Sequence, residues 1–286
     1  MRLSRRGTLG LLVPGVALLV LMYVAPELYF LRYAAEKPST SSLAVPTVTA
    51  GTFTGFFRSG YDVSVLWHTV AMALATTVVA FAVALPVSYV VGRTTGRAKT
   101  WLVVLAVLSM LVGNVVRSIG WSAMLGYGGI VNRIGTALHL LSGPEQLSDT
   151  YPAVIVVLVS VLLPVMILTL ESSFGSLDTN LERASRDLGA PPFPTFWRVT
   201  LPQVIPGILA GTSIVFVLSL NAYAIPALIG GPRVPALATV MYDSVTQDGN
   251  YPVAAVIALL LLIIGLAGIG AYSFLLRRQF EGWRTR

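Results

Sequence analysis

Leu181-Glu-Arg-Ala-Ser-Arg-Asp-Leu-Gly-Ala190 is a charged stretch between two very apolar segments, and it continues through prolines to Leu201-Pro202. Its charges predict a helix, because two opposite pairs are four residues apart and such pairs meet on a helix surface: Glu182 with Arg186, and Arg183 with Asp187. Gly189 is typical of a helix stop, and the prolines at 191, 192 and 194 prevent continuation. A helix of about two to three turns is unstable alone in water, so we expect other parts of the protein to hold it.

The composition around this stretch indicates a membrane protein. Apolar residues make up 55% of the 286-residue chain and charged residues 11%, against about 25% charged in soluble domains, and the mean hydropathy is +0.79. Several apolar runs reach about 20 residues, enough to cross the bilayer as helices, and they lack the period of two typical of membrane barrels. We therefore expect an all-α polytopic membrane protein. The chain has no cysteine, which excludes disulfides and thiolate metal sites within it.

Charges and turn formers separate six predicted spans, at about 9–31, 64–92, 101–125, 152–171, 204–226 and 252–276. The first is too long for the apolar part of a signal peptide, so we expect it to be retained. Thirteen of the 19 Lys and Arg residues lie in the terminal segments and in alternate connections. The positive-inside rule therefore predicts that both termini and the loop 172–203 are cytoplasmic. We expect Gly- and Pro-rich segments on the outer side, at about 32–63, 126–151 and 227–251.

Four polar residues interrupt predicted spans and are candidates for a translocation path or gate: Asn114, Arg117, Asn221 and Tyr223. Along a straight helix, Arg117 would lie roughly 24 Å above the inner end of its span. Two interpretations stay open for it, an arginine that binds backbone carbonyls and stabilises the bundle, or a residue that lines an outward cavity. For the two residues of the fifth span, interhelical hydrogen bonds and a gate or path are equally compatible with the pattern.

The charged stretch likewise has two interpretations from its chemistry alone, a surface helix that links two spans or a docking element for a cytoplasmic partner. Small residues at Ala184 and Gly189 allow another surface to approach, and Leu188 offers an apolar anchor. The residues assigned to docking are Glu182, Arg183, Ala184, Arg186, Asp187, Leu188, Gly189 and Ala190.

The stretch resembles the cytoplasmic loop of binding-protein-dependent ABC importer permeases, whose signature is Glu-Ala-Ala, three residues, Gly, nine residues, Ile-x-Leu-Pro. Nine residues after Gly189 come Val199, Thr200 and Leu201-Pro202, so the second half matches. The first half departs, since the signature Glu falls on Arg183 and Glu182 precedes it by one residue. The resemblance implies a six-helix permease domain of the type I importer fold over residues 1–286, with the short helix docked on an ATP-hydrolysing subunit.

Other motifs resemble the spermidine/putrescine-type permeases in particular: Asn114-Val-Val-Arg117, Gly120-Trp121, Gly128-Gly-Ile-Val-Asn132, Leu163-Pro164, and Asn221-Ala-Tyr-Ala-Ile-Pro226 before Gly230-Gly231. That resemblance implies a polyamine as the solute, and relatives that import ferric iron, opines or phosphonates leave those solutes as alternatives.

The resemblance implies that the chain is a transport subunit in the bacterial cytoplasmic membrane and not an enzyme. Its implied partners are a dimer of ATP-binding subunits, a second homologous permease, an extracytoplasmic solute-binding protein and membrane lipid, with no nucleic acid. No G-x-x-x-x-G-K-[ST] loop occurs, so we expect ATP and Mg²⁺ to bind to the partner and no cofactor or metal to bind here. A stand-alone secondary transporter is the alternative from another class. An intramembrane enzyme is disfavoured, because no H-E-x-x-H, no G-x-S-x-G and no intramembrane Asp pair occurs.

Overall fold

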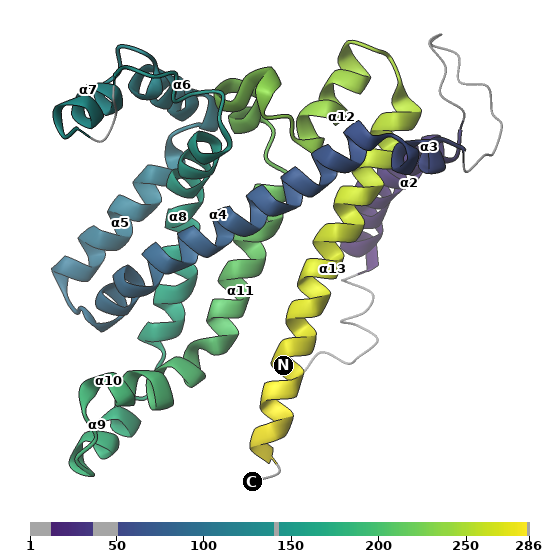
Figure 1. Cartoon of the computed structure of the whole chain (residues 1–286). Helices are drawn as coiled ribbons and strands as arrows, with labels where there is room; N and C mark the ends of the chain where they lie inside the picture. Colours follow the sequence, from purple (N-terminus) through teal and green to yellow (C-terminus); the bar gives the residue numbers. More distant parts are fainter. Residues whose placement is uncertain (1–12, 37–50, 140–142, 285–286) are drawn as a thin grey trace. The chain divides into compact units, whose positions relative to one another are not determined.

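The computed structural model (Figure 1) describes residues 13–36, 51–139 and 143–284. The basic residues at the N-terminus lie outside this range, and so do the prolines at 38 and 46. Every regular element in the described residues is helical, which confirms the predicted all-α class. The elements, in chain order, are η1 (Val20–Val24), α2 (Ala25–Arg32), η2 (Tyr33–Ala35), α3 (Gly51–Arg58), α4 (Gly60–Arg93), α5 (Arg97–Leu111), α6 (Asn114–Leu125), α7 (Ile130–Ala137), α8 (Tyr151–Gly175), α9 (Thr179–Asp187), α10 (Pro192–Thr195), η3 (Phe196–Thr200), α11 (Leu201–Leu220), η4 (Pro226–Gly230), η5 (Gly231–Arg233), α12 (Leu237–Thr246) and α13 (Tyr251–Arg284).

Five stretches of helix in the described residues are long and apolar enough to cross a membrane: Val13–Ala35, Gly60–Arg93, Tyr151–Gly175, Pro192–Leu220 and Tyr251–Ala271. A sixth results if α5 and the following segment Asn114–Ala137 form one span, bent by 91°. The count of six is therefore compatible with the structure. The straight third span predicted at about 101–125 is wrong, because Val112 and Gly113 adopt extended backbone angles between α5 and α6.

The fifth span also differs from its predicted limits of about 204–226. Its helix begins at Pro192, where α10, η3 and α11 run on without a break, and it ends at Leu220. A proline in the first turn of a helix loses no intrahelical hydrogen bond, so Pro192 can begin the next helix shortly after α9 has ended. The three segments predicted as outer loops contain the short helices α3, α7 and α12.

The described residues form two compact units, one made of residues up to Ser64 with Val240–Leu262, and the other of Val65–Thr239 with the residues from Ile263 onward. In the first unit, the Thr52 hydroxyl donates to the Glu36 carbonyl at 2.6 Å, and the Tyr33 and Tyr251 rings lie 5.9 Å apart. None of the predicted docking or path residues lies in the described part of this unit.

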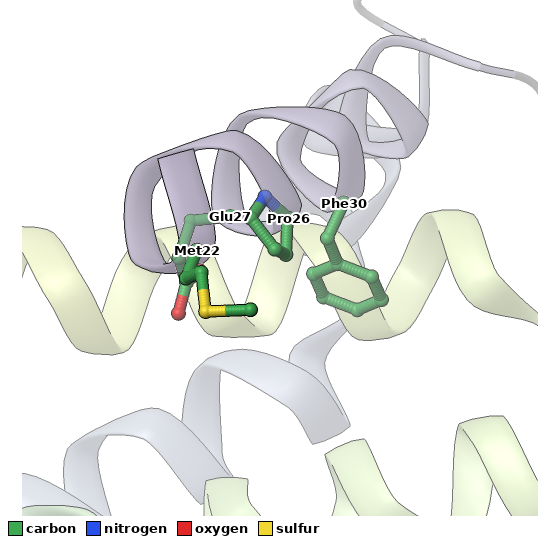
Figure 2. Close-up of a pocket in the computed structure, with 4 residues that line it drawn as sticks. All are labelled: Met22, Pro26, Glu27 and Phe30. Atoms are coloured by element: carbon green, nitrogen blue, oxygen red, sulfur yellow. The ribbon is translucent and has the colours of Figure 1, made fainter. Parts of the chain in front are cut away.

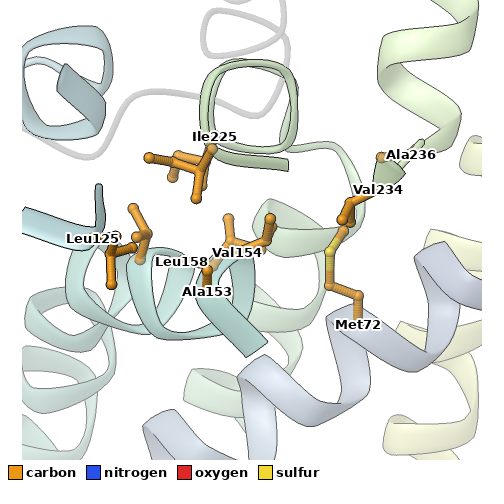
Figure 3. Packing of buried hydrophobic residues seen from close by; sticks show 10 residues of the cluster. Met72, Leu125, Ala153, Val154, Leu158, Ile225, Val234 and Ala236 are labelled. Carbon is orange, nitrogen blue, oxygen red and sulfur yellow. The ribbon is translucent and has the colours of Figure 1, made fainter. Parts of the chain in front are cut away.

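The second unit is built around α8, which packs against α11, α5 and α6. Apolar residues occupy every side of α8, and those that face its neighbours, such as Val154, Val157 and Leu158, are fully buried, while Val156 between them is exposed. One buried cluster joins α8 to α4, to the end of α6 and to η4 (Figure 3): Met72, Leu125, Ala153, Val154, Val157, Leu158, Ile225, Ile229, Val234 and Ala236. A second cluster joins the other half of α8 to α4 and α11: Ala80, Ala84, Val159, Leu162, Met166, Leu170, Phe174, Val204 and Val215. In Figure 1, α9 and α10 lie at the end of this unit opposite α6 and α7.

Candidate functional site

The charged stretch forms α9, a nine-residue helix with a cap at each end. The Asp178 carboxylate accepts a hydrogen bond from the Asn180 backbone N–H at 2.9 Å, which satisfies one of the free donors at the helix start. At the other end, the Gly189 N–H donates to the Arg186 carbonyl and the Ala190 N–H donates to the Ser185 carbonyl. This Schellman geometry needs a left-handed residue, and Gly189 has φ +81°. The predicted helix and its stop at Gly189 are confirmed.

Glu182 points inward from α9, and its side chain is 8% exposed. Its carboxylate forms an ion pair with Arg93, the last residue of α4, and accepts a hydrogen bond from the Thr200 hydroxyl at 2.6 Å. The predicted surface pair with Arg186 is therefore wrong, because the Glu182 carboxylate is used inside the protein. No ion pair between Arg183 and Asp187 is found in the described part of the chain either.

Arg93 lies in an aromatic setting that fixes the end of α4. Its guanidinium carbon is 5.5 Å from the centre of the Tyr89 ring, a cation–π distance. The Tyr89 ring meets Phe174 of α8 and Phe196 of η3 edge-on, at 5.5 and 5.3 Å between centroids. A Cβ on Gly92 would lie 2.6 Å from the Phe174 Cβ, so glycine is what allows α4 and α8 to approach this closely.

Two further contacts complete this end of the unit. The hydroxyls of Ser185 in α9 and Thr195 in α10 are 3.1 Å apart, and this hydrogen bond closes the turn that the prolines make. Lys99 at the start of α5 forms an ion pair of 2.7 Å with Glu171 of α8. The second pair joins two spans without involving α9.

The opposite side of α9 is exposed. Leu181, Ala184 and Leu188 are spaced at i, i+3 and i+7, so they form one apolar stripe on the helix, and Leu188 is 89% exposed. The charged residues on the exposed surface of α9 are Arg183, Arg186 and Asp187. We call the exposed residues Leu181, Arg183, Ala184, Arg186, Asp187 and Leu188 the α9 face. It combines an apolar stripe with two positive charges and one negative charge.

Arg117 lies in the first turns of α6, directly after the bend. Its guanidinium donates to the carbonyls of Ser109 in α5 and Ser160 in α8, the latter at 3.1 Å. The Ser160 carbonyl has no helical partner, since Pro164 four residues later lacks an N–H. Trp121 donates to the Ser160 hydroxyl at 3.0 Å. The structure therefore shows the carbonyl-binding arginine that was one of two open interpretations, and the bend means that Arg117 is not 24 Å along a straight helix.

The other candidate path residues lie at helix ends. Asn114 begins α6, and its carbonyl accepts from the Ser118 hydroxyl at 2.8 Å. Asn221 caps the end of α11, where its side-chain amide donates to the Val217 carbonyl at 2.9 Å. Tyr223 is 38% exposed in the segment between α11 and η4. Asn114 and Arg117 share helix α6, which packs against η4, the element that follows Tyr223. The role of the four candidate residues in a translocation path stays a prediction.

One sequence motif has a structural explanation of its own. Asn132, from the Gly-rich stretch, is 1% exposed, and its amide donates to the carbonyls of Gly126 and Glu145 at 2.9 and 2.8 Å. The Glu145 N–H donates back to the Asn132 side-chain oxygen at 3.0 Å. Asn132 thus fastens the segment between α7 and α8 to the end of α6.

Sequence reasoning missed Arg93, Tyr89 and Thr200 as members of the site. Arg93 counts in the sequence only as one of the topological positive charges, and its partner is 89 residues away, so no spacing rule could pair them. A shallow open pocket in the first unit is lined by Met22, Pro26, Glu27 and Phe30 (Figure 2). All four belong to one helix long and apolar enough to span a membrane, and none of them is among the predicted site residues.

Comparison with known proteins gives a family for this architecture. Residues 47–281 match the model of the family described as "Binding-protein-dependent transport system inner membrane component". The chain is 29% identical to the spermidine/putrescine transport system permease protein PotB of Haemophilus influenzae, over 92% of this chain and 93% of PotB. It is also 29% identical to the molybdenum transport system permease protein ModB of Mycobacterium bovis, over 71% of this chain and 76% of ModB.

A solved structure is similar in fold. A chain of a bacterial ABC transporter involved in the import of the acidic polysaccharide alginate superposes with a TM-score of 0.78, over 94% of each chain, at 15% sequence identity. At this identity the similarity concerns the fold alone.

Proposed function

This chain belongs to the family of binding-protein-dependent transport system inner membrane components, and on that premise we propose how it binds its ATPase and which solute it moves. The chain is a multi-pass membrane permease subunit of an ABC importer. The observation that supports the docking proposal is α9 itself, a capped helix whose one buried acid is paired internally while its apolar stripe stays exposed.

We propose that the α9 face inserts into a groove on the ATP-binding subunit. Anchors at i, i+3 and i+7 are the pattern by which a helix enters an apolar groove, and Leu181, Ala184 and Leu188 have that spacing. Small Ala184 between two leucines lets the groove wall approach the backbone. Because two arginines and one aspartate are exposed on α9 while Glu182 is buried, the partner groove should carry more acidic than basic residues.

The docking proposal is tested by co-purification of the ATP-binding subunit with variants of the permease. Ala184→Trp puts bulk in the middle of the stripe without disturbing a buried contact, and it should lower the retained ATPase by about tenfold or more, equivalent to about 1.4 kcal/mol. The matched control is Ala137→Trp, at an exposed alanine of another short helix, α7. Retention that is equal in the two variants would show that α9 is not the docking helix.

For the solute, we propose a polyamine, delivered by a binding protein on the outer side to the path that this chain and a second permease form. The support is the similarity to PotB over almost the full length of both chains. Arg117 is compatible with a cationic solute, because the carbonyls of Ser109 and Ser160 partly compensate its charge. The equal identity to ModB makes an oxyanion the second candidate.

Uptake into proteoliposomes distinguishes the two solutes. The assembled permease pair, its ATP-binding subunits and its binding protein are reconstituted, and ATP-dependent uptake of labelled spermidine is measured. We expect excess putrescine to compete and excess molybdate to have no effect. Uptake of labelled molybdate in place of spermidine would overturn the polyamine assignment and leave the permease function intact.

A further inference from the structure

The ion pair between Arg93 and Glu182 lies on the side of α9 that faces the protein, so it is not part of the α9 face. The Glu182 side chain is 8% exposed and that of Arg93 24%, and Thr200 supplies a third contact at 2.6 Å. A partly buried, charge-assisted hydrogen bond is directional and strong. Three segments therefore meet at one carboxylate: α9, the residue before α11 in the same loop, and the end of α4, which is 89 residues away in sequence.

Arg93 is the last residue of a 34-residue helix that is long enough to cross the membrane. Its turn of α4 is fixed from several sides, by the Tyr89 ring against Phe174 and Phe196 and by the close approach at Gly92. A displacement of Glu182 consequently acts on a firmly packed helix end rather than on a free side chain.

The other contacts described for α9 lie within its own loop. The hydroxyls of Ser185 and Thr195 share a hydrogen bond, α9 packs against α10 and η3, and a helix of nine residues has little stability alone. Without the Arg93 contact, α9 could tilt about its own loop and leave α4 in place.

We propose that Arg93 and Glu182 are positioning residues that make α9 and α4 move as one body, so that a movement of α9 on the ATP-binding subunit reaches a membrane-spanning helix. This proposal rests on the proposed docking of α9. It assigns the one acidic residue in the first turn of α9 to transmission inside the permease, and it leaves the binding of the ATPase to the exposed α9 face.

The test is the number of solute molecules imported per ATP hydrolysed by the reconstituted transporter. The variant Arg93→Met with Glu182→Met removes both charges, so no buried charge is left unpaired. We expect it to retain the ATPase and to hydrolyse ATP, while the solute imported per ATP falls by about fivefold or more. The single variant Arg93→Lys keeps the positive charge beside Glu182, so it should keep most of the natural protein's ratio of solute imported per ATP.

The matched control is Lys99→Met with Glu171→Met, which removes the neighbouring ion pair between α5 and α8 and should leave the ratio near that of the natural protein. As a milder variant, Thr200→Val removes one contact of Glu182 and should lower the ratio less. An unchanged ratio in the Arg93 and Glu182 double variant would overturn the proposal. Loss of the ATPase from that variant would also overturn it, since the pair would then serve docking. Failure of the natural protein to retain the ATPase would instead contradict the proposed function.

Discussion

Arg117 and Pro164 belong to different sequence motifs, and the structure shows that one compensates for the other. Pro164 leaves the Ser160 carbonyl in α8 without its helical N–H, and Arg117 donates to that oxygen and to the Ser109 carbonyl near the end of α5. In the hydrocarbon core a freed carbonyl is costly, so proline is tolerated where another group satisfies it. The same guanidinium also opposes the partial negative charge at the C-terminal end of α5.

We predict that Arg117→Met destabilises the protein by about 1–3 kcal/mol, because two carbonyl groups lose their charged donor. The measurement is thermal unfolding in detergent. Arg133→Met is the matched control, an exposed arginine of α7 whose replacement should leave the midpoint almost unchanged. Equal midpoints for the two variants would show that Arg117 does not stabilise the bend between α5 and α6.

Glu182 shows what the residue pattern could not reveal. From the sequence, its nearest opposite charge on a helix is Arg186, four residues on, and that local pairing is a sound prediction for an isolated helix. In the folded chain a residue 89 positions away is the partner, and a contact of this kind depends on how α4 meets α9. Pattern reasoning therefore located the helix and its stop at Gly189 correctly, while the N-terminal cap and the division of its residues between the inward and outward sides required the structure.

At the scale of elements, apolar length predicted where spans occur better than where they bend. The spans containing α4, α8 and α13 agree with the runs in the sequence, because a helix in lipid has to satisfy its own backbone over the whole hydrocarbon thickness. The third run fails at Val112 and Gly113, within a continuous apolar sequence. Arg117, four residues beyond Gly113, is the signal of the bend, which the interpretation of this run as one straight helix overlooks.

After α9 the prediction fails in the other way, because a segment that the prolines predict to be a loop is helical. From the sequence they predict the end of helix α9 and a loop up to about residue 203. The helix does end, but Pro192 then begins α10, from which the chain continues through η3 into α11. Proline is disfavoured in the interior of a helix and favoured in its first turn. A proline therefore marks a helix boundary, but it does not tell whether the helix lies before it or after it.

At the scale of the whole molecule, the side of the membrane on which α9 lies decides whether it can meet an ATPase. Arg186 lies on α9 and Arg133 on α7, at opposite ends of the second unit (Figure 1). The excess of Lys and Arg in the terminal segments and alternate connections predicts that the α9 end is cytoplasmic. Both residues are exposed, so each offers a position for a chemical label.

The chain contains no cysteine, so a single introduced cysteine is the only thiol that a maleimide can label in it. In intact spheroplasts we expect a membrane-impermeant maleimide to label Arg133→Cys and to leave Arg186→Cys unlabelled until the membrane is opened. A membrane-permeant maleimide should label both variants, which controls for the accessibility of each side chain. The reverse pattern would place α9 outside the cell, where no ATP-binding subunit could reach it, and the proposed docking and the proposed link through Arg93 would both fail.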